Sequence, residues 1–317
     1  ATYVQKFIIQ EELAYAGGPE TLIAVSMAGP VVLRYGSEEQ KNSYLPRIAR
    51  GEVEFALGYT EPQAGSDLAA LEIRAVDQGD HFVMNGQKVF NTSCHYAQYH
   101  WLGARTDTTG PRHRGISLFI VDMKTPGIEV RPIWCLSRRT NEVFYDNVRV
   151  PKSNMVGEKN KGWIYIGEAL AYERTWITGD SRRLLEELVA YAGRTKRNGR
   201  TLAEEPMVRQ RLAELAVEVE TSYLFGLRNA WMLDNGRVPH YEAPMAKVFG
   251  SELYGRVAQA AMQLLGPYSQ VLEGSKWVEL EGLAARRYLD GPRPVITRGS
   301  SEIMRNIVAL RGLDLPR

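Results

Sequence analysis

Hydrophobic residues near the start of the chain recur every three or four positions, the spacing of one face of an amphipathic helix. From Phe7 onward this pattern predicts a helix over residues 3–28, broken at Gly17-Gly18-Pro19. A second, short helix is expected to begin after Ser37, a favourable N-cap residue, and to end at Gly51.

Residues 53–150 change to alternating or continuous runs of residues that favour β-strands. Runs such as FALGYT, GISLFIVDM and EVFYDNVRV are separated by turns rich in Gly, Asn and Asp. The segment is too small and too turn-rich for a parallel sheet with crossover helices. It therefore predicts a compact all-β unit.

After Pro151 the helical spacing returns and persists, with loops that contain Gly or Pro. Such a series predicts an antiparallel bundle of long helices. Helices are expected near residues 161–193, 205–234, 241–272, 275–289 and 300–310. The expected fold class is α+β and multidomain: a helical domain over 1–52, a middle β-barrel-like domain over 53–158 and a helical bundle domain over 159–317.

Composition adds few constraints. The 317 residues are 44% hydrophobic and 24% charged, with a formal net charge of +2, which is ordinary for a globular protein and gives no case for nucleic acid or membrane binding. Two cysteines cannot build a disulfide framework and suit a reducing cytoplasm. The apolar run TLIAVSMAGPVVL is too short to span a bilayer and is interrupted by Gly29 and Pro30. The chain begins with Ala1 rather than Met, so we expect the native N-terminus to lie outside this sequence.

Several common motifs are missing. There is no G-x-G-x-x-G after a strand, no phosphate-binding G-x-x-x-x-G-K-[ST] loop, no H-E-x-x-H and no G-x-S-x-G. The five His and two Cys lack zinc-ligand spacing, so no metal site is expected.

Three segments carry candidate chemistry. Residues 58–71 (GYTEPQAGSDLAAL) place hydroxyls and glycines in a turn after a strand, where backbone N–H groups can bind an anionic or carbonyl-rich ligand. Residues 85–93 (NGQKVFNTS) place Phe90 beside Thr92, an aromatic wall next to a hydroxyl donor. Residues 296–312 (ITRGSSEIMRNIVALRG) lead into a helix whose N-terminus offers free N–H donors. Taken singly, each is equally explained as an ordinary turn, a core aromatic residue or a helix cap.

Glu173 stands in the stretch LAYERTW among apolar neighbours. An isolated glutamate on a helix is most simply a solvated charge or a partner of Arg174. Burial would instead make it a base, because desolvation raises the pKa of a carboxyl group.

The order of the motifs resembles that of the acyl-CoA dehydrogenase family. A helix pair is followed by T-E-P-x-A-G-S-D, N-G-x-K-x-[WF]-x-T, A-R-T, E-V-F-x-D-x-V-R-V-P and G-x-S-E-I-x-R-N-I-V-A. The ending RNIVALRGLDLPR, with AYERT and LGPYSQ, is most similar to the bacterial branch that acts on branched or bulky CoA thioesters, including steroid side chains. The resemblance begins inside the family's N-terminal domain, so two or three helices are expected to be missing from the start.

The resemblance implies FAD binding without a Rossmann fold. Thr60 would hydrogen-bond the flavin, Phe90 would take the place of a usual Trp against the flavin ring, and Thr92 would lie near flavin N5. Gln263 to Gly266 match a segment that reaches the FAD of a neighbouring subunit, although Pro267 replaces a family Gly. The implied cofactor residues are Leu57, Tyr59, Thr60, Gly65, Ser66, Phe90, Asn91, Thr92, Gln263, Leu264, Gly266, Ser300 and Glu302; the implied substrate residues are Ser66 and Arg174.

The family carries its base at one of two places. One precedes the G-[TS]-S turn, where this chain has Arg298, which cannot act as a base. The other is an E-R pair on the first long helix of the C-terminal domain, here Glu173-Arg174. The resemblance therefore implies that Glu173 removes the α proton of an acyl-CoA, while the Arg298 backbone amide binds the thioester oxygen.

The resemblance also implies partners. An electron-transfer flavoprotein is the expected electron acceptor, and a homotetramer or heterotetramer in the bacterial cytoplasm is the expected assembly. Two alternatives stay open: an acyl-CoA oxidase that reacts with O₂, and a non-catalytic subunit that shares FAD within a heteromeric dehydrogenase.

Overall fold

The computed structural model describes residues 1–18, 22–173 and 176–316, without the side chains of residues 171–173. Its contacts divide the chain into two compact units. One unit combines residues 1–20 with 174–317, and the other comprises residues 21–173.

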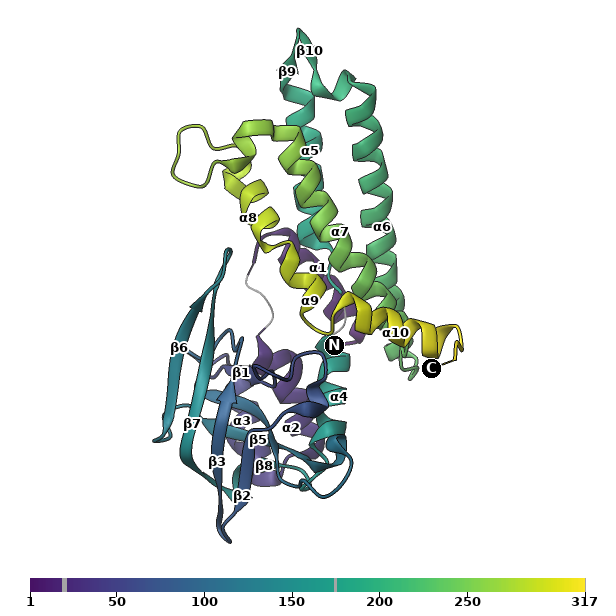
Figure 1. Cartoon of the computed structure of the whole chain (residues 1–317). Coiled ribbons are helices and arrows are strands. Elements are labelled where there is room, and N and C mark those ends of the chain that lie inside the picture. Colours follow the sequence, from purple (N-terminus) through teal and green to yellow (C-terminus); the bar gives the residue numbers. More distant parts are fainter. Residues whose placement is uncertain (19–21, 174–175, 317) are drawn as a thin grey trace. The chain divides into compact units, whose positions relative to one another are not determined.

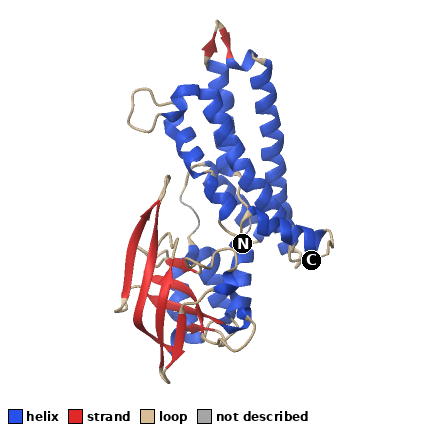
Figure 2. Cartoon of the chain, viewed as in Figure 1, coloured by secondary structure: helices blue, strands red, loops and turns tan. Residues whose placement is uncertain are grey.

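The unit of residues 21–173 is built on an eight-stranded sheet (Figures 1 and 2). Strands β4 and β5 are buried on both faces, as expected for central strands. The strand order is β6-β7-β3-β2-β4-β5-β8, with β1 parallel to β4. The strands are β1 (Phe55–Gly58), β2 (Arg74–Asp77), β3 (His81–Lys88), β4 (Tyr99–Arg105), β5 (Ile116–Asp122), β6 (Ile128–Trp134), β7 (Arg139–Pro151) and β8 (Met155–Val156).

Helices lie beside this sheet in Figure 1 and share its hydrophobic core. They are α2 (Gly29–Tyr35), α3 (Glu38–Ala49) and α4 (Gly162–Glu173), preceded by a π-helical turn at Ala24–Ala28. The expected Ser37 cap is confirmed: its hydroxyl accepts from the Gln40 N–H, and the Gln40 side chain accepts from the Ser37 N–H. Gly29 and Pro30, which divide the apolar run of the sequence, lie in the first turn of α2, a position that proline tolerates.

The other unit is a helix bundle in which α5, α6 and α7 run side by side (Figure 1). Buried Leu184, Leu188, Tyr191 and Ala192 on α5 repeat at helical spacing and face α7 residues such as Leu253. Helix α1 packs on α5 and α6. The helices are α1 (Tyr3–Tyr15), α5 (Gly179–Arg194), α6 (Pro206–Asp234), α7 (Glu242–Leu265), α8 (Leu283–Asp290), α9 (Pro292–Ile296) and α10 (Ser301–Gly312), and a short hairpin pairs β9 (Lys196–Arg197) with β10 (Arg200–Thr201).

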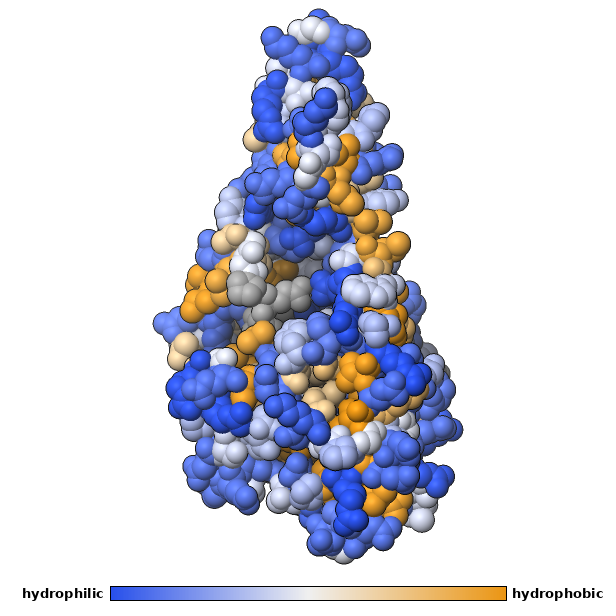
Figure 3. Space-filling model, turned by 90° about the vertical axis from the view of Figure 1, so that its left-hand side faces the viewer, coloured by the Kyte–Doolittle hydropathy of each residue, from blue (hydrophilic) through white to orange (hydrophobic). Residues whose placement is uncertain are grey.

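The expected order of helical, β and helical segments is confirmed. The helix expected over 275–289 begins only at Leu283, because Leu280, Glu281 and Gly282 have positive φ angles of 49°, 52° and 70°. No helix among the described residues is long and apolar enough to cross a membrane. On the face drawn in Figure 3, hydrophobic residues form separate patches among hydrophilic ones.

Candidate active site

The turn that follows β1 presents polar backbone to the surface. Glu61 and Ala64 exchange two backbone hydrogen bonds of 3.0 Å, which close the turn on itself. Gly65 and Ser66 lie exposed at its tip, and a side chain at position 65 would meet nothing within 4 Å. The outer face of the turn therefore has room for a bound group close to its N–H groups.

Buried charges lie beneath this turn. The Glu61 carboxylate pairs with the Lys88 ammonium at 2.8 Å, and both side chains are almost completely buried. Lys88 Nζ also donates to the Tyr59 carbonyl at 2.9 Å. The Tyr59 hydroxyl accepts from Trp101 Nε1 at 2.9 Å inside the core. The side chain of Tyr59 thus serves packing inside the core.

The segment after β3 lies next to the end of β1. The Val89 N–H donates to the Thr60 carbonyl at 2.9 Å, and Asn91 Nδ2 donates to the Leu57 carbonyl at 2.7 Å. Asn91 Oδ1 is buried without a hydrogen-bond partner. The structure therefore brings together the two segments that the sequence singled out in the β unit.

Phe90 is held in an unusual conformation in this segment. Its φ of 60° is in the left-handed region, and its side chain is 60% exposed. Asn141 on β7 fixes the adjoining backbone by donating from Nδ2 to the Asn91 carbonyl at 2.7 Å and to the Thr92 carbonyl at 3.1 Å. The Thr92 side chain is exposed. A fixed backbone thus presents an aromatic ring and a hydroxyl to the surface.

A buried histidine supports the same region. His100 Nδ1 lies 2.6 Å from the Tyr145 hydroxyl, and its Nε2 has no partner. Burial lowers the pKa of His100 to about 3, so its ring is neutral. A Cβ at Gly58 would lie 2.3 Å from His100 Nε2, which explains why a glycine ends β1.

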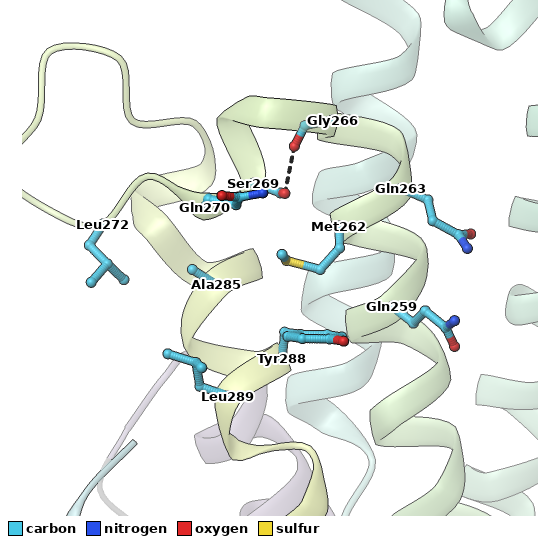
Figure 4. Close-up of a pocket in the computed structure, with 10 residues that line it drawn as sticks. All are labelled: Gln259, Met262, Gln263, Gly266, Ser269, Gln270, Leu272, Ala285, Tyr288 and Leu289. Atoms are coloured by element: carbon cyan, nitrogen blue, oxygen red, sulfur yellow. Dashed lines mark hydrogen bonds between the residues drawn. The ribbon is translucent and has the colours of Figure 1, made fainter. Parts of the chain in front are cut away.

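In the bundle unit, Gln263 and Gly266 line a pocket of about 700 Å³ (Figure 4). Gly266 ends α7 with a φ of 57°, and its carbonyl accepts from the Ser269 hydroxyl at 2.6 Å. Tyr288 comes from α8 on the opposite wall. Leu264 is half-buried and packs on the bundle core.

Arg298 and Gly299 form a left-handed turn before α10, with φ angles of 59° and 88°. The Ser300 hydroxyl caps α10 by accepting from the Ile303 N–H at 3.4 Å. Hydrogen bonds from its own backbone N–H and from Ser300 lower the pKa of the Glu302 carboxyl in the first turn. This turn keeps backbone N–H groups and a carboxylate at one helix end.

Glu173 is the last residue of α4. Its side chain, and the whole of Arg174, lie outside the described residues. Beyond them, the indole of Trp176 is buried against α7 at Gly250, where a Cβ would lie 2.1 Å from the ring. Among the described residues, no group of three or more His, Cys, Asp or Glu is arranged to hold a metal ion.

Sequence reasoning missed the supporting residues Glu61, Lys88, Asn141 and His100. Glu61 and Lys88 both belong to the motifs that drew attention to these segments. Their pairing across 27 positions comes from the tertiary contact of the two segments, in which the Val89 N–H donates to the Thr60 carbonyl, and no local pattern reports it.

Comparison with known proteins covers nearly the whole chain. Residues 1–52, 56–148 and 160–313 match the family profiles of the acyl-CoA dehydrogenase N-terminal, middle and C-terminal domains. Acyl-CoA dehydrogenase FadE29 of Mycobacterium tuberculosis is 35% identical over 325 residues, which covers 99% of this chain and 81% of the relative.

Solved structures named as acyl-CoA dehydrogenases are also similar to this chain. The Tcur3481-Tcur3483 steroid ACAD matches with a TM-score of 0.95 at 35% identity, over 100% of this chain and 82% of that chain. The ChsE4-ChsE5 complex from Mycobacterium tuberculosis matches with a TM-score of 0.94 at 34% identity, over 100% of this chain and 83% of that chain. The chain therefore belongs to the acyl-CoA dehydrogenase family, whose members are FAD-dependent flavoprotein oxidoreductases.

Proposed function

We propose that this acyl-CoA dehydrogenase acts on a branched or bulky acyl-CoA thioester and that Glu173 is its base. The assignment of the base rests on which residues this chain has at the two positions where the family carries its base. Arg298 occupies the turn before α10, and a guanidinium cannot accept a proton at neutral pH. Glu173 ends α4, and it is the remaining carboxylate at a position that the family uses.

The β unit is suited to FAD on its own structural grounds. The turn at residues 61–66 has an open outer face with exposed Gly65 and Ser66. Phe90 and Thr92 offer an exposed ring and hydroxyl beside it, and Asn91 Oδ1 is a buried acceptor without a partner. We assign the flavin contacts of this unit to Leu57, Thr60, Phe90, Asn91 and Thr92, and to the backbone of Tyr59.

The bundle unit supplies a second set of cofactor contacts in this proposal. Gln263 and Gly266 line the pocket of Figure 4, and Ser300 and Glu302 begin α10. Because the family completes one FAD site with two chains, we assign this set, together with Leu264, to the cofactor of a neighbouring subunit. Gly65 and Ser66 are assigned to the first set, with Ser66 also facing the CoA.

The chemistry requires the loss of one proton and one hydride from adjacent carbons. FAD, when bound, supplies the hydride acceptor. The Glu173 carboxylate takes the α proton, and the thioester oxygen gains negative charge as that proton leaves. We assign to the backbone N–H of Arg298, in the left-handed turn before α10, the donation of a hydrogen bond to that oxygen. Arg174 is proposed as a substrate contact beside the base.

The substrate class is supported by the relatives. The matched structure is named a steroid ACAD, and its 35% identity extends over the whole of this chain. Incubation with saturated straight-chain, branched and steroid side-chain CoA thioesters tests this directly. Mass spectrometry should show loss of two hydrogens fastest for the bulky substrates. A preference for unbranched short chains would contradict the proposed substrate class.

A non-catalytic role within a heteromeric assembly is the second candidate. It is favoured by Arg298 at one of the family's base positions and by relatives that are themselves complexes of two chains. Expression alone and with its genomic neighbours of the same family separates the candidates. Turnover that persists when the partner's own base is removed assigns catalysis to this chain, whereas complete loss assigns it to the partner.

A further inference from the structure

Three buried charged residues bind the inner side of the turn after β1. None of them is among the proposed cofactor contacts. They are Glu61 in the turn itself, Lys88 at the end of β3 and Arg105 at the end of β4. Glu61 is 3% exposed, Lys88 0% and Arg105 9%. Charged residues are this deeply buried only when other groups satisfy them.

Glu61 binds the far end of the loop. Its carboxylate accepts from the Glu72 N–H at 2.6 Å and from the Ile73 N–H at 3.0 Å. It also accepts from Gln63 Nε2 at 2.8 Å and from Lys88 Nζ at 2.8 Å. One carboxylate therefore ties the start of the loop to the two residues just before β2.

Lys88 and Arg105 bind the backbone carbonyls at the two ends. Lys88 Nζ donates to the Tyr59 carbonyl at 2.9 Å, where the loop begins. Arg105 Nη2 donates to the Ala69 carbonyl at 2.6 Å and to the Leu71 carbonyl at 2.9 Å, where the loop ends. The loop of residues 59–73 is thus closed by side chains from three strands or turns, all on its inner side.

Burying these charged groups costs free energy, and a contribution to stability alone does not explain why they are buried here. Replacing a buried ion pair with apolar residues of similar volume is often neutral or stabilising. The bonds from these three residues go mainly to the backbone of a single loop, and they fix where its outer N–H groups point. A ligand that binds such a preformed loop does not have to order it first.

We propose that Glu61, Lys88 and Arg105 are positioning residues that hold the cofactor loop in its binding conformation before FAD arrives. The inference rests on the proposed function, in which residues 57–66 contact FAD. None of the three is assigned a contact with the cofactor; each acts through the loop backbone.

The first test uses the unaltered chain. Apoprotein prepared by removing FAD is compared with holoprotein by hydrogen exchange of the backbone N–H groups of Glu61, Ala64, Glu72 and Ile73, which donate inside the loop. A preformed loop predicts that these amides are protected in the apoprotein as well. Protection that arises only after FAD is added would overturn the proposal.

The second test uses Lys88→Met, with Glu61→Gln as the variant that preserves side-chain shape. Lys152→Met is the matched control, because Lys152 forms a 2.8 Å ion pair with Asp77 in the same unit but is 43% exposed. Reconstitution of each apoprotein with FAD gives the dissociation constant. Lys88→Met should weaken FAD binding by roughly tenfold or more. The control should bind like wild type.

Thermal unfolding with and without FAD separates positioning from a purely structural role. Because a ligand stabilises a protein according to its affinity, the gain in Tm on adding FAD should shrink in Lys88→Met and Glu61→Gln. Equal losses of Tm in apoprotein and holoprotein, with unchanged FAD affinity, would overturn the inference. Failure of the wild-type assembly, co-expressed with its partner chains, to take up FAD would instead overturn the proposed function on which it rests.

Discussion

At the scale of single residues, Glu173 carries the proposed proton transfer. Glu173→Gln is nearly isosteric, so it removes the base with little change in packing. We expect FAD content and fold to be retained and kcat to fall by roughly 10²–10⁴-fold, the usual contribution of a general base. Steady-state kinetics with bound FAD measured by absorbance provide the check. Retention of more than about a tenth of the turnover, a difference of only ~1.4 kcal/mol, would remove Glu173 from this role.

Arg298 should matter through its backbone rather than its side chain. We expect Arg298→Ala to change KM modestly and to leave kcat within roughly tenfold of wild type, because the N–H donor is kept. In the Glu173→Gln background, Arg298→Glu should restore part of the activity, since the family uses a base at either position. A structure with bound acyl-CoA in which the thioester oxygen lies far from the 298 amide would contradict this account.

The residues of the candidate site were predictable to different degrees. Gly65, Phe90 and Thr92 are exposed residues in or beside turns, and turns carry a local signature. Tyr59 was selected with them, yet its side chain is buried with Trp101, because the direction of a side chain at a strand end depends on register. Long-range partners such as Lys88 follow from tertiary pairing, which one sequence does not display.

At the scale of elements, the contact of α1 with α5 contains an unusual carboxylate. Glu11 is 1% exposed, and its Oε1 accepts from the Thr178 N–H at 2.7 Å, just before α5 begins. Gly179 lets α1 approach closely, since a Cβ there would lie 2.1 Å from the Glu11 carbonyl. Burial raises the pKa of Glu11 to about 7. Glu11 therefore caps a helix of the bundle from a neighbouring helix, largely in its protonated form at mildly acidic pH.

Glu11 should make the stability of the bundle depend on pH. Its pKa in the folded state lies above the usual 4.5. Its contribution to the free energy of unfolding is therefore fully present below pH 4.5 and is lost as the pH rises through about 7. Glu11→Gln cannot titrate and should lose less stability than wild type between about pH 5 and pH 8, by at most about 3 kcal/mol.

Denaturant unfolding at the two pH values measures this difference. The charged groups that act on Glu11 are Arg182, Asp180 and Glu12. Glu252→Gln is the control, because Glu252 pairs with Arg305 in the same unit and is not among the groups that act on Glu11. An identical pH dependence in wild type and Glu11→Gln would show that Glu11 titrates normally.

Most helices and strands could be predicted from hydrophobic spacing and capping residues. The buried face of an amphipathic helix or a strand shows in the spacing of its own hydrophobic residues. The start of α8 could not be predicted in this way, and the helix expected over 161–193 is two helices, α4 and α5, with non-helical residues 176–178 between them. Residues 275–289 have helical spacing, but three successive positive φ angles at 280–282 delay the helix to Leu283. Two of these residues are Leu and Glu, which rarely adopt such angles, so their composition gives no warning.

At the scale of the whole molecule, the order of the segments along the chain does not match the two units in which they pack. Helix α1 packs with the bundle, and α4 packs with the sheet unit, so contacts do not follow the expected boundaries at residues 52 and 158. Phe7 of α1 contacts Tyr223 of α6 with ring centroids 5.4 Å apart, a tertiary pairing that no local pattern contains. We retain the three-part division as a proposal about the sequence, and the two units as the description of its packing.

Assembly should be required for cofactor binding. The proposed FAD contacts fall into two sets, residues 57–92 and 263–302, which we assign to two different chains. We therefore expect a homotetramer or a heterotetramer, measured by light scattering together with the ratio of FAD to protein. Dilution that dissociates the assembly should release FAD. A monomer that retains FAD tightly would contradict this assignment.

The most direct test of the central claim is an anaerobic titration of the purified FAD-loaded assembly with a bulky saturated acyl-CoA, followed by the visible absorbance of the flavin. Our account predicts that the flavin absorbance bleaches as the unsaturated thioester forms, and that an electron-transfer flavoprotein restores it. The same titration in Glu173→Gln should bind the thioester without bleaching. A wild-type flavin that stays oxidised with every acyl-CoA, with and without co-expressed partners, would contradict the account.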